Sequence, residues 1–117
     1  KKFYLIDWRQ NFAGGDIGDV YYDLAKMYGG ILMSYSSMKD KGSSWSCSYS
    51  GEEASFEHER SPSLERFEKF YENWLVSNNF DLDKVKTLTA LIFLNMAPLH
   101  EKEFGYLCFF KSKLMLS

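Results

Sequence analysis

The chain is poor in cysteine and proline, and its few cysteines exclude a disulfide-rich secreted scaffold. Only Cys47 and Cys108 occur among 117 residues, far apart and without a CxxC pair. We therefore expect two reduced thiols in a cytoplasmic protein, with a single Cys47–Cys108 disulfide as the alternative that the sequence leaves open. A zinc site is not expected either, because no second histidine or cysteine stands at ligand spacing from any of these residues.

The chain also lacks a surplus of basic residues and any long apolar run. Its formal net charge is -2, which disfavours non-specific nucleic-acid binding, since that depends on Lys and Arg neutralising phosphates. A membrane-crossing helix needs about 20 apolar residues, and the densest run, residues 88–94, is far shorter. No basic helical face suits a membrane surface, and we expect no signal peptide here, because only four apolar residues follow Lys1-Lys2 before Asp7. We expect neither nucleic acid nor membrane as a partner.

What the chain has in abundance is apolar and aromatic side chains. Hydrophobic residues make up 45% of the sequence and aromatic residues 18%, which is enough for a sizeable core. The length fits one domain or part of one. We expect a mainly α fold over residues 1–117, with a strand and loop at 1–19 and a helical subdomain at 20–117 that contains a small β-hairpin near 45–59.

Capping residues and apolar spacing predict four helices. Asp16 or Asp19 can cap a helix over residues 20–33, and Ser61-Pro62 is typical of a helix start. The other predicted helices cover residues 61–77, 81–97 and 101–116, with Pro98 bending or ending the third. Periodicity predicts the inner faces. In the first helix the expected core positions are Tyr21, Leu24, Ala25, Tyr28 and Leu32, and in the second they are Leu64, Phe67, Phe70, Tyr71 and Trp74. The third helix is expected to be buried on nearly all sides, with Val85, Leu88, Leu91, Ile92 and Leu94 in the core. In the last helix the expected core positions are Phe104, Leu107, Cys108, Lys111, Leu114 and Met115.

The first 26 residues carry the strongest chemical signal. An apolar run over residues 3–6 predicts a short buried strand, and it ends in the carboxylate of Asp7. An aspartate at the mouth of a strand can hold Mg²⁺, which prefers carboxylate oxygen ligands. From spacing alone, a plain turn residue is the more common interpretation of Asp7.

Two stretches of sequence bear on that choice: Leu-Ile-Asp-Trp-Arg at residues 5–9, and Gly-Asp-Val-Tyr-Tyr-Asp-Leu-Ala-Lys at residues 18–26. Together they resemble the metal-binding segment of the aminoglycoside phosphotransferase and choline kinase family, whose members are small-molecule kinases related to protein kinases. The resemblance implies that Asp7 binds Mg²⁺ and, through it, ATP. It implies that Asp23, with Asp19 beside it, supports the catalytic loop structurally.

The same resemblance implies a fold and an activity. The chain would be the helical C-terminal subdomain of a kinase-like fold. The parent enzyme would move the γ-phosphoryl group of ATP to a hydroxyl of a small polar acceptor, either an amino alcohol such as choline or a sugar. Residues 96–100 are similar to a helix-end segment of members associated with capsule or surface polysaccharide.

Other parts of the family's machinery have no counterpart in the sequence. The catalytic loop, His-x-Asp followed by Asn, is expected upstream of Lys1, and no Gly-rich nucleotide loop such as GxGxxG occurs. We therefore expect this chain to be inactive alone, and its partners to be a missing N-terminal lobe or a second copy in a homo-oligomer. The alternative is a non-catalytic helical protein-interaction domain whose aromatic faces pack on a partner.

The remaining candidate residues carry weaker signals. Arg9 could pair with a phosphate or with Asp19. An exposed position on the surface is the alternative. His58 and His100 are single histidines that we interpret as structural or surface residues. Four aromatic residues could form a cage for a quaternary ammonium ion, although aromatic residues at such spacings more often belong to the core: Trp8, Trp45, Tyr49 and Trp74.

Overall fold

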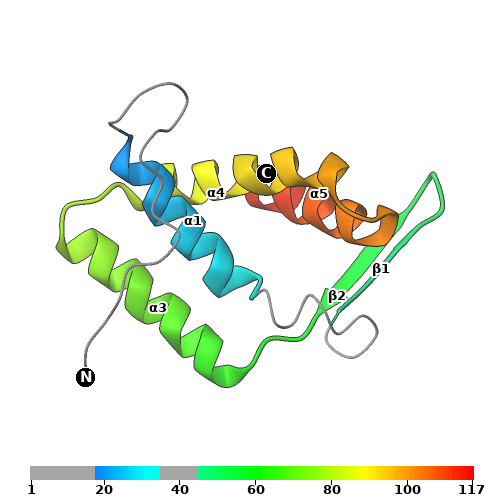
Figure 1. The fold of residues 1–117 in the computed structure, drawn as a ribbon. Coiled ribbons are helices and arrows are strands. Elements are labelled where there is room, and N and C mark those ends of the chain that lie inside the picture. Colours follow the sequence, from blue (N-terminus) through cyan, green and yellow to red (C-terminus); the bar gives the residue numbers. More distant parts are fainter. Residues whose placement is uncertain (1–17, 35–44) are drawn as a thin grey trace, which may run out of the picture.

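The computed structural model describes residues 18–34 and 45–117, and in these ranges the protein is mainly helical with one small antiparallel sheet (Figure 1). The elements are α1 (Val20–Leu32), β1 (Trp45–Tyr49), β2 (Ala54–His58), α3 (Pro62–Ser77), α4 (Leu82–Met96), a single 3-10 turn η1 (Ala97–Leu99) and α5 (Lys102–Leu116). The predicted mainly α fold with a hairpin insert is therefore confirmed. The predicted strand at residues 3–6 lies outside the described residues.

Side-chain caps explain where three of the helices begin. Asp19, Ser61 and Asp81 each accept a hydrogen bond from a backbone N–H two or three residues further on, which satisfies a free donor of the first turn. Pro62 is the first residue of α3, where its missing N–H is not needed. At the other end of α3, Asn79 adopts a φ of 63°, the left-handed conformation that ends a helix. These features confirm the starts predicted from the sequence.

The hairpin forms between the two segments that alternation predicted. Trp45 pairs with His58 and Tyr49 with Ala54, so the strands are in register without a bulge. The turn contains Gly51 at a φ of 94°, a conformation that suits glycine. Trp45 lies at the end of the hairpin next to the helices and is 6% exposed, whereas the strand residues toward the turn are mostly exposed. One end of the hairpin is thus anchored in the core.

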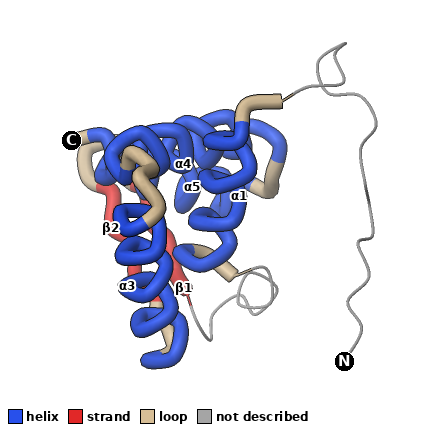
Figure 2. The backbone as a smooth tube through the Cα atoms, turned by 90° about the vertical axis from the view of Figure 1, so that its left-hand side faces the viewer, coloured by secondary structure: helices blue, strands red, loops and turns tan. Residues whose placement is uncertain are grey.

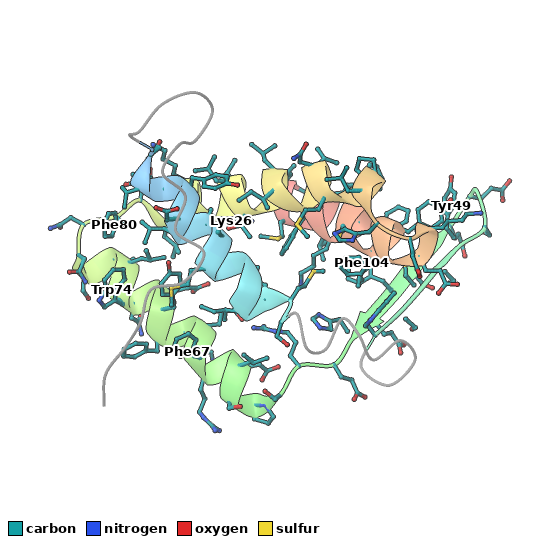
Figure 3. All side chains as sticks on the ribbon, viewed as in Figure 1. Lys26, Tyr49, Phe67, Trp74, Phe80 and Phe104 are labelled. Atoms are coloured by element: carbon teal, nitrogen blue, oxygen red, sulfur yellow. The ribbon has the colours of Figure 1, made fainter. Side chains whose placement is uncertain are left out.

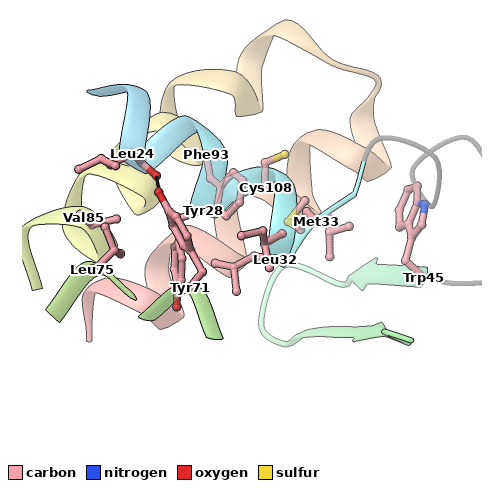
Figure 4. Packing of buried hydrophobic residues seen from close by; sticks show 12 residues of the cluster. Leu24, Tyr28, Leu32, Met33, Trp45, Tyr71, Leu75, Val85, Phe93 and Cys108 are labelled. Atoms are coloured by element: carbon pink, nitrogen blue, oxygen red, sulfur yellow. Dashed lines mark hydrogen bonds between the residues drawn. The ribbon is translucent and has the colours of Figure 1, made fainter. Parts of the chain in front are cut away.

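Helix α1 lies at the centre of the helical part, with α3 on one side and α4 on another, and α5 packs against α4 (Figures 1 and 2). Two hydroxyls fix this arrangement: Tyr71 Oη donates to the Leu24 carbonyl at 3.0 Å, and Thr89 Oγ1 donates to the Ala25 carbonyl at 3.1 Å. The core cluster is drawn in Figure 4. It contains Leu24, Tyr28, Ile31, Leu32, Met33, Trp45, Tyr71, Leu75, Val85, Phe93, Leu107 and Cys108.

The apolar face predicted for α3 was partly wrong. Tyr71 is buried, but Phe67, Phe70 and Trp74 are 41%, 63% and 42% exposed, and Leu75 takes the inner position instead. Tyr71 and Leu75 are four residues apart and therefore face the core together, while the three exposed rings form a neighbouring stripe of the same helix. Apolar periodicity could not show which of the two adjacent stripes faces α1.

The nearly all-round burial predicted for α4 was also wrong. Leu91 and Leu94 are 46% and 39% exposed. Val85, Thr89 and Phe93 recur every four residues and form the buried side, where α1 and α5 pack. Within the described ranges, no helix combines the length and apolar character needed to cross a membrane.

Candidate functional site

The first turn of α1 is tied to the first turn of α4 by a small polar cluster. Asp19 Oδ1 accepts from the Tyr21 N–H at 2.9 Å, and Asp19 Oδ2 lies 3.9 Å from Lys84 Nζ. Lys84 Nζ in turn lies 4.0 Å from the centre of the Tyr21 ring, and Tyr21 Oη accepts from the Asp81 N–H at 3.0 Å. Asp19 is therefore the residue that caps α1 in the structure. This cluster fixes the point at which the N-terminal segment enters the helical core.

Some of the predicted site residues precede the start of α1, and others lie in its first turn. Asp23 is exposed in the first turn of α1, where the helix dipole favours a carboxylate. Asp7, Trp8, Arg9 and Asp16 lie outside the described residues. In the part of the chain that is described, no three His, Cys, Asp or Glu side chains gather as a metal site. The metal role of Asp7 therefore stays a prediction.

A pocket of about 510 Å³ opens where α1, α4 and α5 meet the start of β1. Its walls are mostly apolar and aromatic, with a few polar groups at the edge, which is the usual character of a small-molecule site. The lining residues are Ala25, Lys26, Gly29, Gly30, Met33, Trp45, Ile92, Phe93, Met96, His100, Glu101, Glu103 and Phe104. Figure 3 marks Lys26 and Phe104, which stand on α1 and α5 respectively.

Aromatic rings and carboxylates give this pocket a definite chemical character. The Trp45 and Phe104 rings pack edge to face at 5.7 Å, and His100 packs edge to face on Phe104 at 4.7 Å. Among the described residues that line the pocket, Glu101 and Glu103 contribute carboxylates and Lys26 contributes an ammonium group. Aromatic faces together with carboxylates suit a ligand that is apolar in its body and carries a positive charge. We call this hollow the α1–α5 pocket.

A half-buried polar network fastens α1 to α3. Tyr28 Oη donates to Glu72 Oε1 at 2.7 Å and to Glu68 Oε1 at 3.3 Å. Burial, followed by the hydrogen bond to Glu72, raises the pKa of Tyr28 far above its ordinary value. Arg60 pairs with Glu68 and also donates to the Ile31 carbonyl at 3.0 Å, and Lys86 lies 3.2 Å from Glu72. The network joins α1, α3, α4 and the segment after β2.

His58 stands at the edge of this network, at the end of β2. Its Nδ1 atom is buried and has no hydrogen-bond partner within the part of the chain that is described. Burial and the nearby charges of Lys111 and Arg60 lower the pKa of His58. Burial likewise lowers the pKa of Lys111, with Arg60 adding to the effect. His58 is thus a structural histidine held in its neutral form, in agreement with its interpretation from the sequence.

The described members of the suggested aromatic cage do not come together. Trp74 stacks on Tyr71 and Phe80 in the α3 region, whereas Tyr49 packs on Tyr106 and Phe110 at the far end of the molecule (Figure 3). Trp45 alone lines the α1–α5 pocket. The other described rings that line this pocket are those of Phe93, His100 and Phe104.

Both cysteines are free thiols, as predicted. Cys108 is fully buried, and burial raises its pKa to about 11, so it is protonated at neutral pH. Cys47 is half-buried, and burial followed by the charge of Glu103 raises its pKa. Neither thiol has the lowered pKa of a catalytic nucleophile.

Comparison of the chain with protein-family models, with curated proteins and with solved structures gives no match. Sequence reasoning had missed most of the pocket, above all Lys26, Phe93 and Glu103. The one available signal was Gly29-Gly30, a glycine pair inside a predicted helix.

Proposed function

We propose that the chain is the C-terminal part of a small-molecule kinase of the aminoglycoside phosphotransferase and choline kinase type. The observation that carries this proposal is the pair of motifs at residues 5–9 and 18–26. The second motif lies wholly within the described residues, and its packing supports the proposal. Asp19 caps α1, while Leu24 and Ala25 are buried and their carbonyls are bound by Tyr71 and Thr89. The second motif is therefore packed firmly into the helical core.

In this proposal Asp7 holds Mg²⁺ and thereby ATP, and Asp23 braces the catalytic loop. Phosphoryl transfer depends on a metal that bridges phosphate oxygens, and an aspartate is a suitable ligand for it. Asp23 is exposed at the first turn of α1 and is therefore accessible to a loop supplied from outside the described residues. The catalytic base would also come from outside this chain, so the chain is inactive alone.

The acceptor would bind in the α1–α5 pocket. A volume of about 510 Å³ accommodates a small polar acceptor, and the carboxylates of Glu101 and Glu103 suit an amino alcohol such as choline better than an anionic substrate. A sugar is the second acceptor class that fits an aromatic wall with polar groups at its edge. A cytoplasmic location, where ATP is plentiful, belongs to the same proposal and agrees with two free thiols.

Calorimetric titration of Mg·ATP into the chain tests the metal role. We expect binding that Asp7→Ala abolishes. Asp16→Ala, a loop aspartate from the same region of the sequence, is the matched control and should bind like the unchanged chain. Equal binding by the unchanged chain and by Asp7→Ala would refute the role of Asp7, and with it the proposal.

A second candidate function is a non-catalytic interaction domain. The specific observation in its favour is the exposed aromatic stripe on α3, formed by Phe67, Phe70 and Trp74. Under this alternative, Asp7→Ala changes stability only. Light scattering tests this surface directly: self-association that Phe70→Ser abolishes would show that the aromatic stripe binds a second copy, whereas a monomer that persists on concentration would count against that role.

A further inference from the structure

Helix α1 contains two adjacent glycines that lower its stability, although the backbone conformation at these positions does not require glycine. Gly29 and Gly30 lie in its last turn, and neither has the positive φ that disfavours other residues. A glycine inside a helix is less favourable than alanine because it loses more conformational freedom on folding. Some other requirement must therefore account for a pair of them here.

Packing does not require glycine at these positions either. A Cβ atom added at Gly29 would lie 3.5 Å from the Phe93 ring and 3.6 Å from Thr89 Cγ2, which is ordinary van der Waals contact. A Cβ atom added at Gly30 would meet nothing within 4 Å. Both residues line the α1–α5 pocket, and Gly30 is the one of the two that borders open space.

We propose that Gly30 determines the size of the ligand that the α1–α5 pocket accepts, because the missing side chain leaves room for a bulky group beside α1. The inference takes the ligand class, a small amine, from the proposed function. The size limit itself is argued from the empty space at Gly30. Gly29 plays a lesser part, since a methyl group there would rest on Phe93.

Two regions of the pocket would contact two different parts of such a ligand. The positive charge belongs near Glu101 and Glu103, whose carboxylates lie at the start of α5. The apolar body then lies among the apolar walls, with α1 contributing the smooth surface of its two glycines. A longer side chain at position 30 takes up that room and leaves the carboxylates untouched. It should therefore exclude bulky amines and spare small ones.

The test uses two amines of different bulk, choline and benzyltrimethylammonium, titrated into the full 117-residue chain and followed by backbone amide NMR shifts. The unchanged chain should bind both, with the largest shifts at residues of the pocket. Gly30→Leu should weaken benzyltrimethylammonium by about 10-fold or more and choline by less than about 3-fold, because the atoms of leucine beyond Cβ would compete with the bulky group, and a misfit in an apolar pocket changes binding by roughly 10- to 200-fold. Gly30→Ala is the matched control and should retain both ligands.

Each other outcome overturns the inference. Unchanged binding of both amines by Gly30→Leu would show that position 30 does not limit the ligand, and equal weakening of both would show that it does not select by size. Failure of the unchanged chain to bind either amine would remove the pocket as an amine site. Gly30→Met repeats the comparison with an unbranched chain should Gly30→Leu fold poorly. The Mg·ATP titration does not involve this pocket, so a failure of the metal role and a failure at Gly30 are told apart.

Discussion

Replacing Tyr28 by phenylalanine should loosen the attachment of α1 to α3 without disturbing the packing of the ring. Tyr28 is 2% exposed, and its ring stacks near that of Tyr71 at 6.2 Å. Only the hydroxyl is lost in Tyr28→Phe, and with it the hydrogen bonds to Glu72 and Glu68 at 2.7 Å and 3.3 Å. The change therefore isolates the polar network from the hydrophobic core.

The expected loss follows from the charge and exposure of the two acceptors. A hydrogen bond to a charged group contributes about 1.5–3 kcal/mol to stability. The side chain of Glu72 is 25% exposed and keeps Lys86 at 3.2 Å, and Glu68 keeps Arg60, so neither carboxylate becomes an isolated buried charge. We therefore expect the lower limit, a decrease of about 1.5 kcal/mol in the free energy of unfolding, or roughly 6 °C in the melting temperature of a chain of this size.

Equilibrium unfolding in urea measures this change. Tyr106→Phe is the control, because Tyr106 is also half-buried among rings but its hydroxyl makes no hydrogen bond with the described residues. It should change stability by less than about 0.5 kcal/mol. A Tyr28→Phe variant as stable as the Tyr106→Phe control would refute the role assigned to the network.

Three further changes test other parts of the account. The pKa of His58 is lowered in the folded state, so the unfolded chain takes up this proton first as the pH falls below about 6.5. The free energy of unfolding should therefore decrease on acidification, and it should decrease less steeply in His58→Gln than in the unchanged chain. Leu75→Ala should lower the free energy of unfolding by about 2–5 kcal/mol, because Leu75 is fully buried, whereas Val76→Ala, at 58% exposed, should change it little. A thiol reagent should modify Cys47 well before Cys108, which is fully buried.

Each of these has an outcome that contradicts it. Parallel stability curves for the unchanged chain and His58→Gln between pH 7 and pH 5 would show that protonation of His58 does not oppose folding. Similar losses in Leu75→Ala and Val76→Ala would mean that the inner face of α3 is wrongly assigned. Simultaneous modification of both thiols under native conditions would indicate that the core around Cys108 opens as readily as the hairpin.

The starts of the helices and the position of the hairpin could be predicted because they depend on neighbours in sequence. Asp19, Ser61 and Asp81 cap from within two or three residues, and Gly51 turns the chain between two alternating segments. Such signals are local and need no knowledge of the tertiary structure. The structure contains these caps and this turn at the predicted positions.

The inner faces of α3 and α4 could not be predicted as well, since burial depends on which helices lie opposite. Phe70 and Leu75 are both apolar and lie on neighbouring stripes of α3, yet one is 63% exposed and the other is fully buried. Apolar side chains are common on protein surfaces, so hydrophobicity alone does not decide between them. Similarly, Leu91 in α4 is exposed while Thr89, a polar residue, is buried because it bonds to the Ala25 carbonyl.

The candidate site divides in the same way. The aspartate at residue 7 and its motif can be read from the sequence because the residues are contiguous. The α1–α5 pocket could not be, because Gly30, Phe93 and Phe104 come from three helices and meet only in the folded chain. The sequence shows the glycine pair as two poor helix formers, and the structure shows that both line the α1–α5 pocket.

The measurement that tests the central claim most directly is the effect of Mn²⁺, a paramagnetic substitute for Mg²⁺, on the backbone amide signals of the chain in the presence of ATP. The account predicts that the amide signals nearest Asp7 in sequence broaden first at low Mn²⁺, that Asp7→Ala removes this broadening, and that Asp16→Ala retains it. Broadening that is the same in Asp7→Ala as in the unchanged chain, or that is confined to surface carboxylates elsewhere, would contradict the assignment of Asp7 as the metal ligand.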